Sequence, residues 1–126
     1  TNSKIGTLAS KILDKKLYDN QSVVKVKTKE ELNHKNFPEA IYFKRKTLKN
    51  DLNTYHHVGI YCYEMRTLKD FVSHKQSPNE TKYNLEQLRA LENKIKINVA
   101  LAKSHSIGID TKEDFVAIKK IMEYKT

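Results

Sequence analysis

The chain has 126 residues, a formal net charge of +9 and one cysteine, Cys62. A chain of this length forms one domain at most, and we expect residues 1–126 to be a single domain with a modest core. One cysteine excludes an internal disulfide and a cysteine-based zinc site, and the sequence shows neither a membrane-length apolar run nor a secretory signal. We therefore expect a reduced, cytoplasmic setting and no membrane partner.

The positive charge does not by itself indicate nucleic-acid binding. Only three of the 24 basic residues are arginines, and the lysines are spread from Lys4 to Lys125. Side chains that read bases or clamp phosphates are often arginines, because the guanidinium forms a bidentate fork. We predict a solvated, lysine-rich surface without a nucleic-acid partner, whose positive field can still help attract an anionic substrate.

The first half of the chain is predicted to consist mainly of strands. The apolar stretches that indicate them are Ile5–Ile12, Val23–Val26, Ala40–Phe43 and Tyr55–Met65. In the last of these, the two-residue period of a strand separates two faces. One face carries Val58, Ile60 and Cys62; the other carries His57, Gly59, Tyr61 and Tyr63. We expect Cys62 to pack in the core.

The second half is predicted to contain two helices around one more strand. Ser77 is a helix cap, Pro78 suits the first helical position and Glu80 completes a capping box, so the first helix should run to about Asn93. Residues 94–102 alternate as a strand does. Thr111 and Asp114 cap a last helix with residues at core-facing spacing: Phe115, Ile118, Ile121 and Met122. The predicted fold class is α/β, a mixed sheet with two or three covering helices.

Four segments, in this order and at suitable separation, resemble the CMP-Kdo synthetases, the cytidylyltransferases that activate 3-deoxy-manno-octulosonate (Kdo) for lipopolysaccharide synthesis. The segments are Tyr55–Tyr63 (the family's H-[LIV]-G-I-Y-G-Y), Ser77–Glu80 (S-P-L-E), Leu85–Asn93 (L-E-Q-L-R-x-L) and Gly108–Asp114 (G-V-D-T-P-E-D). Weaker matches to the family pattern lie at Thr7–Ala9, Val24–Val26 and Ala40–Arg45. The resemblance spans nearly the whole chain and implies the C-terminal half of a Rossmann-like nucleotidyltransferase fold.

Departures from the family pattern are also present. Lys44, Cys62 and Glu64 stand where the family usually has serine, glycine and arginine, and the family's I-P-W-D-R stretch is not recognisable after Arg45. The chain starts at Thr1, not at a methionine and only four residues before the predicted strand Ile5–Ile12, so we expect a partial chain, although a processed start would look the same. The N-terminal family segments that hold the triphosphate, the cytosine and one metal-binding aspartate are absent from these 126 residues.

The resemblance implies a reaction and a metal. In the family, the anomeric hydroxyl of Kdo attacks the α-phosphate of CTP and pyrophosphate leaves, with Mg²⁺ held by carboxylates and phosphate oxygens. The resemblance assigns Asp110 as the catalytic residue that binds Mg²⁺. On spacing alone, Asp110 with Glu113 is more typical of a helix-capping box than of a metal site. Without the missing half, we expect this chain alone to be inactive.

The resemblance also implies a sugar-binding set. Arg45 is the candidate for the Kdo carboxylate, or else a surface arginine. His57 and Tyr61 share a strand face and could both reach a ligand, whereas a lone histidine is usually structural. Glu86 and Gln87 would hold sugar hydroxyls; alternatively Glu86 pairs with Arg89, and Gln87 forms a local cap with Asn84.

Three hypotheses about function follow from the residues and the resemblance. The first is the sugar-binding and dimer-forming half of a CMP-Kdo synthetase, with CTP and Kdo as substrates, a homodimer partner and the N-terminal half of the same enzyme. The second is a non-catalytic relative kept as a dimerisation or sugar-acid-binding module. The third is a cytidylyltransferase for another sugar acid, which depends on whether Arg45, His57 and Gln87 line one pocket.

Overall fold

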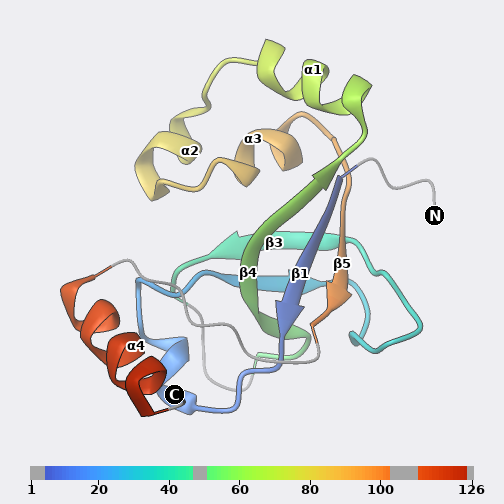
Figure 1. The fold of residues 1–126 in the computed structure, drawn as a ribbon. Coiled ribbons are helices and arrows are strands. Elements are labelled where there is room, and N and C mark those ends of the chain that lie inside the picture. The colour runs from blue at the N-terminus through green and yellow to red at the C-terminus, as the bar shows by residue number, and fades with distance from the viewer. Residues whose placement is uncertain (1–4, 47–50, 103–110, 125–126) are drawn as a thin grey trace.

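Five strands form one mixed sheet in the order β3-β2-β4-β1-β5 (Figure 1). The computed structural model describes residues 5–46, 51–102 and 111–124. Strands β1 and β5 are parallel, and the other neighbouring strands are antiparallel. The elements, in chain order, are β1 (Ile5–Ser10), the 3-10 helix η1 (Lys15–Tyr18), β2 (Lys25–Thr28), β3 (Ala40–Lys44), β4 (Thr54–Tyr63), α1 (Met65–Ser73), α2 (Pro78–Tyr83), α3 (Gln87–Glu92), β5 (Ile97–Leu101) and α4 (Lys112–Tyr124). The predicted mixed α/β fold is confirmed.

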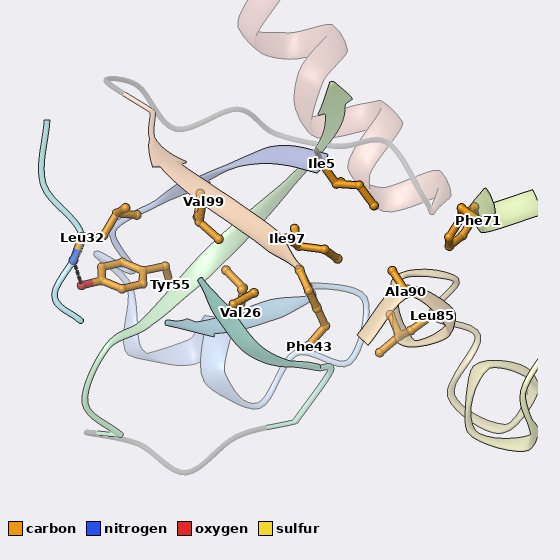
Figure 2. Close-up of a cluster of buried hydrophobic side chains, with 12 residues drawn as sticks. Ile5, Val26, Leu32, Phe43, Tyr55, Phe71, Leu85, Ala90, Ile97 and Val99 are labelled. Carbon is orange, nitrogen blue, oxygen red and sulfur yellow. Dashed lines mark hydrogen bonds between the residues drawn. The ribbon is translucent and has the colours of Figure 1, made fainter. Parts of the chain in front are cut away.

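One face of the sheet forms the core. Paired residues on neighbouring strands share a face, and the register lines up Tyr63, Ile5 and Ile97 in one row across β4, β1 and β5. Helices α1, α2 and α3 lie together on one side of the sheet in Figure 1. Figure 2 shows side chains from α1 and α3 gathered beside those of the sheet. The buried apolar cluster comprises Ile5, Ala9, Val26, Leu32, Ala40, Phe43, Tyr55, Phe71, Leu85, Ala90, Ile97 and Val99.

Strand β4 contains an irregularity that matters for the site. Thr7 of β1 pairs with Tyr61, whereas the next residue, Leu8, pairs with Val58, so Gly59 and Ile60 are inserted between them. Because two residues are inserted, the alternation of side chains is preserved on either side. The predicted separation of the two strand faces is therefore confirmed for the aromatic residues.

The opposite face of the sheet is poorly covered by the described residues. The register places Cys62, Gly6 and Asn98 in one row on this face, and Ile60 is 61% exposed. Cys62 is exposed as well. The prediction that Cys62 packs in the core is wrong, because the strand period assigns a face but does not say whether that face is covered.

The helix predicted to start at Ser77 is two helices. The capping box is confirmed, since Glu80 N donates to Ser77 Oγ at 3.0 Å and Ser77 N donates to Glu80 Oε2 at 3.3 Å. The prediction of one helix to about Asn93 is wrong: Asn84 adopts a left-handed conformation, with φ of 54°, that ends α2. Leu85 then inserts into the core, and α3 starts at Gln87. Core packing decided this break.

Two other helices differ from expectation. Helix α1 was not predicted; only Thr67 and Phe71 are buried in it, and Glu64 at its start makes no side-chain cap bond. For α4 the cap is confirmed, with Asp114 N donating to Thr111 Oγ1 at 3.1 Å. Its predicted core-facing role is wrong within the described residues, where Phe115 is 54% exposed and Met122 64% exposed. Among the described helices, none is sufficiently long and apolar to span a membrane.

Candidate functional site

A row of aromatic rings crosses the helix-covered face of the sheet. The ring centroid of His57 lies 5.0 Å from that of Phe43 and 5.5 Å from that of Tyr61. Tyr61 continues to Tyr63 at 5.9 Å, and Tyr63 to Phe71 of α1 at 6.2 Å. These spacings are within the range of favourable aromatic pairs. The structure thus brings together His57 and Tyr61, as the strand period predicts.

His57 is a neutral polar group inside this row. It is 8% exposed, and burial, with a smaller contribution from the charge of His56, lowers its pKa to about 4. Its Nε2 lies 2.8 Å from the Thr7 hydroxyl oxygen. Near neutral pH the ring therefore carries no charge, so it can exchange hydrogen bonds with a ligand but cannot offer a cation to a carboxylate.

Helix α3 brings two of the predicted residues to the same side of the sheet. Glu86 is exposed at the start of α3, and its negative charge helps raise the pKa values of Tyr61 and Tyr63, although burial is the main cause for both. Its carboxylate therefore lies within electrostatic reach of both phenols.

Gln87 is the more unusual member of this pair. It is 7% exposed, and within the described part of the chain its amide makes no side-chain hydrogen bond. Leaving such a group unpaired in the interior costs about 1–3 kcal/mol. A buried amide without a partner is a signal for a ligand contact, because a bound hydroxyl would supply the missing bond.

Neither structural alternative for this pair takes the predicted form. The direct ion pair of Arg89 is with Glu80 of α2: Arg89 Nη2 lies 2.6 Å from Glu80 Oε1, and Nε donates to Oε2 at 2.9 Å. This bidentate contact lowers the pKa of the buried Glu80 carboxyl. Glu80 is the main cause of the raised pKa of Arg89, and the negative charge of Glu86 makes a smaller contribution. Asn84 caps nothing in α3, because it holds the left-handed position that ends α2.

The Arg45 guanidinium donates most of its hydrogen bonds to backbone carbonyls. Its Nε, Nη1 and Nη2 donate to the carbonyls of Tyr83, Gln21 and Asn84 at 3.1, 3.1 and 3.0 Å. Of five guanidinium N–H bonds, one on each terminal nitrogen is not used in these contacts. Arg45 lines a groove of about 600 Å³ together with Tyr83 and Leu85; neither His57 nor Gln87 lines that groove. In the described structure, these three predicted residues therefore do not line one pocket.

The predicted metal ligand, Asp110, lies outside the described residues. Across residues 5–46, 51–102 and 111–124, no group of three or more histidine, cysteine or acidic side chains is placed to hold a metal. Mg²⁺ needs only one or two protein carboxylates when phosphate oxygens complete its ligands, so the predicted site depends on Asp110.

Among the buried polar residues that were not singled out from the sequence, Thr7 and Lys25 have the most informative contacts. Thr7, whose hydroxyl contacts His57, is 4% exposed. In the sequence, only its place in the weak Thr7–Ala9 match to the family pattern indicated a role. Lys25 was taken as one of the solvated lysines, yet its side chain is fully buried and its Nζ donates to the carbonyls of Asn20, at 2.7 Å, and Arg45. Burial lowers its pKa to about 8.

Comparison with known proteins finds relatives that carry the same enzyme name. No protein-family model matches the chain. It is 39% identical over 119 residues to the 3-deoxy-manno-octulosonate cytidylyltransferase of Bartonella henselae, covering 94% of this chain and 48% of that protein. The enzyme of the same name from Thermodesulfovibrio yellowstonii is 40% identical over 132 residues, covering 96% and 49%.

A solved structure gives the same relationship. The chain matches a CMP:2-keto-3-deoxy-manno-octonic acid synthetase complexed with CTP, with a TM-score of 0.77 and 25% identity, over 99% of this chain and 51% of that one. The chain thus spans about half the length of the curated relatives it matches.

Proposed function

We propose that this chain, a relative of the CMP-Kdo synthetases over 94% of its length, is the sugar-acid-binding half of a 3-deoxy-manno-octulosonate cytidylyltransferase. The similarity supports the reaction. One observation supports the position of the sugar: on the helix-covered face, the buried Gln87 amide makes no side-chain hydrogen bond with the described residues, on the same side of the sheet as His57 and Tyr61.

In the proposed reaction the anomeric hydroxyl of Kdo attacks the α-phosphorus of CTP, a new P–O bond forms, and the bond to pyrophosphate breaks. Catalysis of this kind depends mainly on positioning and charge stabilisation. In the proposal, this chain holds the sugar: His57, Tyr61, Glu86 and Gln87 exchange hydrogen bonds with its hydroxyls. The nucleotide is held largely by the other half of the enzyme.

The sugar carboxylate needs a cation, which the neutral His57 does not provide. Arg45 has one remaining N–H on each terminal nitrogen, and either of them could donate to a carboxylate oxygen. Its three backbone contacts would hold the guanidinium in place and reduce the entropy lost on binding. The proposal therefore keeps Arg45 as the carboxylate partner, in the separate groove that it lines with Tyr83 and Leu85.

Mg²⁺ belongs to the proposal through Asp110. When bound, the ion would neutralise phosphate charge. Asp110 would supply one carboxylate, and the remaining ligands would come from the nucleotide and from the rest of the enzyme.

The remaining partners are a second copy of the chain and the N-terminal half of the enzyme. Exposed apolar side chains on the open sheet face, such as Ile60, and on α4, such as Phe115 and Met122, are consistent with both contacts. A cytoplasmic location is part of the proposal, because CTP is its nucleotide substrate.

Calorimetric titration of Kdo into the 126-residue chain and its Gln87→Met variant tests the sugar site. We expect binding to weaken at least roughly tenfold in the variant, the effect of losing one ligand hydrogen bond of about 1.4 kcal/mol. Thermal stability should not fall, because methionine removes the buried amide that no described side chain satisfies. Gln76→Met, at an exposed loop position, is the matched control. Unchanged Kdo binding in the Gln87→Met variant would count against the site.

A second assay separates binding from chemistry. The chain, incubated with CTP, Kdo and Mg²⁺, should release no pyrophosphate, because the sequence contains no glycine-rich loop that could cradle a triphosphate. Robust turnover by the 126 residues alone would overturn this division of roles.

A further inference from the structure

Thr7 contacts three acceptors or potential acceptors at the irregularity in β4. Its Oγ1 lies 2.8 Å from the carbonyl oxygen of Ile60 and 3.4 Å from that of Val58. The same oxygen lies 2.8 Å from His57 Nε2. The two inserted residues, Gly59 and Ile60, disrupt regular β1–β4 pairing at this point, which leaves the carbonyls available to a side chain.

The number of protons available to the Thr7–His57 contact determines the tautomer of His57. A threonine hydroxyl has one proton, and a carbonyl oxygen can only accept. The short contact with the Ile60 carbonyl therefore takes the Thr7 proton. Thr7 Oγ1 then faces His57 with a lone pair, so the bond between them requires a proton on Nε2. The tautomer is inferred from the hydrogen-bond network in this way.

The protonation state of the other ring nitrogen, Nδ1, follows from the charge of the ring. Because burial keeps the ring neutral near pH 7, a proton on Nε2 leaves Nδ1 without one. Among the described residues, none donates a hydrogen bond to Nδ1. A buried ring nitrogen with an empty acceptor position suits a ligand that brings an N–H or O–H group.

We propose that Thr7 is a positioning residue that holds His57 as the Nε2–H tautomer, so that Nδ1 accepts a hydrogen bond from a hydroxyl group of the sugar acid and does not contact its carboxylate. The identity of the ligand rests on the proposed function, whereas the tautomer rests only on the geometry around Thr7. A carboxylate oxygen and Nδ1 are both acceptors and repel each other, whereas a hydroxyl donates to Nδ1. This assigns the carboxylate to a different part of the site.

Nitrogen NMR of the histidine rings tests the tautomer directly. Protonated and unprotonated ring nitrogens resonate far apart, so the ¹⁵N-labelled 126-residue chain at about pH 7.5 reports which nitrogen of His57 carries the proton. We expect a proton on Nε2 in the parent and in Thr7→Ser, which keeps the hydroxyl. Thr7→Val keeps the shape but loses the acceptor, and should show a mixture of tautomers or a proton on Nδ1.

Thr28→Val is the matched control. Thr28 is also fully buried on a strand, and its hydroxyl donates to a backbone carbonyl, that of Glu30, at 2.6 Å. The control removes the same chemical group away from His57, so the tautomer of His57 should not change. A parent protein with the proton on Nδ1, or a Thr7→Val variant with the parent tautomer, would overturn the positioning role.

Binding of two ligands tests which part of the sugar acid meets Nδ1. We expect Thr7→Val to weaken Kdo binding at least roughly fivefold, with rescue in Thr7→Ser. The same loss should be measured for a Kdo analogue in which the carboxylate is reduced to an alcohol. If the loss disappears with the carboxylate, His57 contacts that group and the assignment is wrong. If the parent binds neither ligand, the proposed function and the ligand assignment fail, while the spectra still decide the tautomer.

Discussion

His57 should make the folding stability of this chain depend on pH below neutrality. In the folded protein its pKa is about 4, compared with 6.5 for an unperturbed histidine, because burial disfavours the charged ring. Between these two values the unfolded chain binds a proton that the folded chain does not. The free energy of unfolding therefore falls as the pH drops below about 6.5, and the loss levels off once the folded ring is also protonated near pH 4.

The size of the effect follows from the same two pKa values. A displacement from 6.5 to about 4 corresponds to about 3 kcal/mol when the whole range is crossed, since one pKa unit is worth about 1.4 kcal/mol. From about pH 7 to about pH 4.5 the predicted loss from His57 alone is about 2 kcal/mol. The neighbouring His56 acts in the same direction, because its positive charge disfavours a second positive charge on His57.

A non-titrating variant isolates this contribution. His57→Gln keeps an amide N–H that can donate to Thr7, but it has no proton to gain in this range. Other acid-sensitive groups, such as Glu80 with its lowered pKa, are common to both proteins and cancel in the comparison. Urea unfolding of parent and variant at the two pH values should therefore give a parent loss about 2 kcal/mol greater than that of the variant. Equal losses in the two proteins would show that His57 is not held neutral by burial.

Four further outcomes are expected. Arg89→Ala leaves the buried Glu80 carboxylate without its partner and should lower the free energy of unfolding by about 3 kcal/mol in urea titrations, with a much smaller added loss when Glu80→Gln is combined with it. Lys25, with its pKa near 8, should make the parent more stable as the pH rises from about 8 towards 10.5, because only the unfolded amine stays charged in that range, and Lys25→Met should lack this rise in the same measurement. In protein that also carries the N-terminal half, Asp110→Asn should reduce turnover at least roughly a hundredfold with a thermal midpoint within a few degrees of the parent, since asparagine caps a helix nearly as well as aspartate; near-normal activity with lower stability would identify a cap. Light scattering at micromolar concentration should show the chain as a dimer or larger, because apolar side chains of α4 are exposed, and a clean monomer would contradict that expectation.

Several features of the site could be predicted because they depend on local spacing. The two-residue strand period is enough to put His57 and Tyr61 on one face, and the ring spacing of 5.5 Å agrees. The capping boxes at Ser77 and at Thr111 are equally local, since each needs only two residues three positions apart.

Other features depend on partners that are distant in the sequence. The roles of Thr7 and Lys25 could not be predicted, because a threonine or a lysine at an alternating strand position looks the same whether its face is solvated or buried. The pairing of Arg89 with Glu80 was missed for a related reason: helix spacing favours Glu86, and only the break at Asn84 turns α2 back beside α3. The backbone contacts of Arg45 also join segments far apart in the chain.

By itself, the sequence determined the α/β class, the main strands, the two helix starts and the ordered motifs of the resemblance, because each is encoded in short-range periodicity or in a run of neighbouring residues. Tertiary structure alone decided which sheet face is covered, that Cys62 and α4 are exposed, and that His57 is a neutral ring bonded to Thr7. These depend on burial and on the matching of donors with acceptors from different strands. Both are set by the way the strands and helices pack together, which no single segment of the sequence specifies.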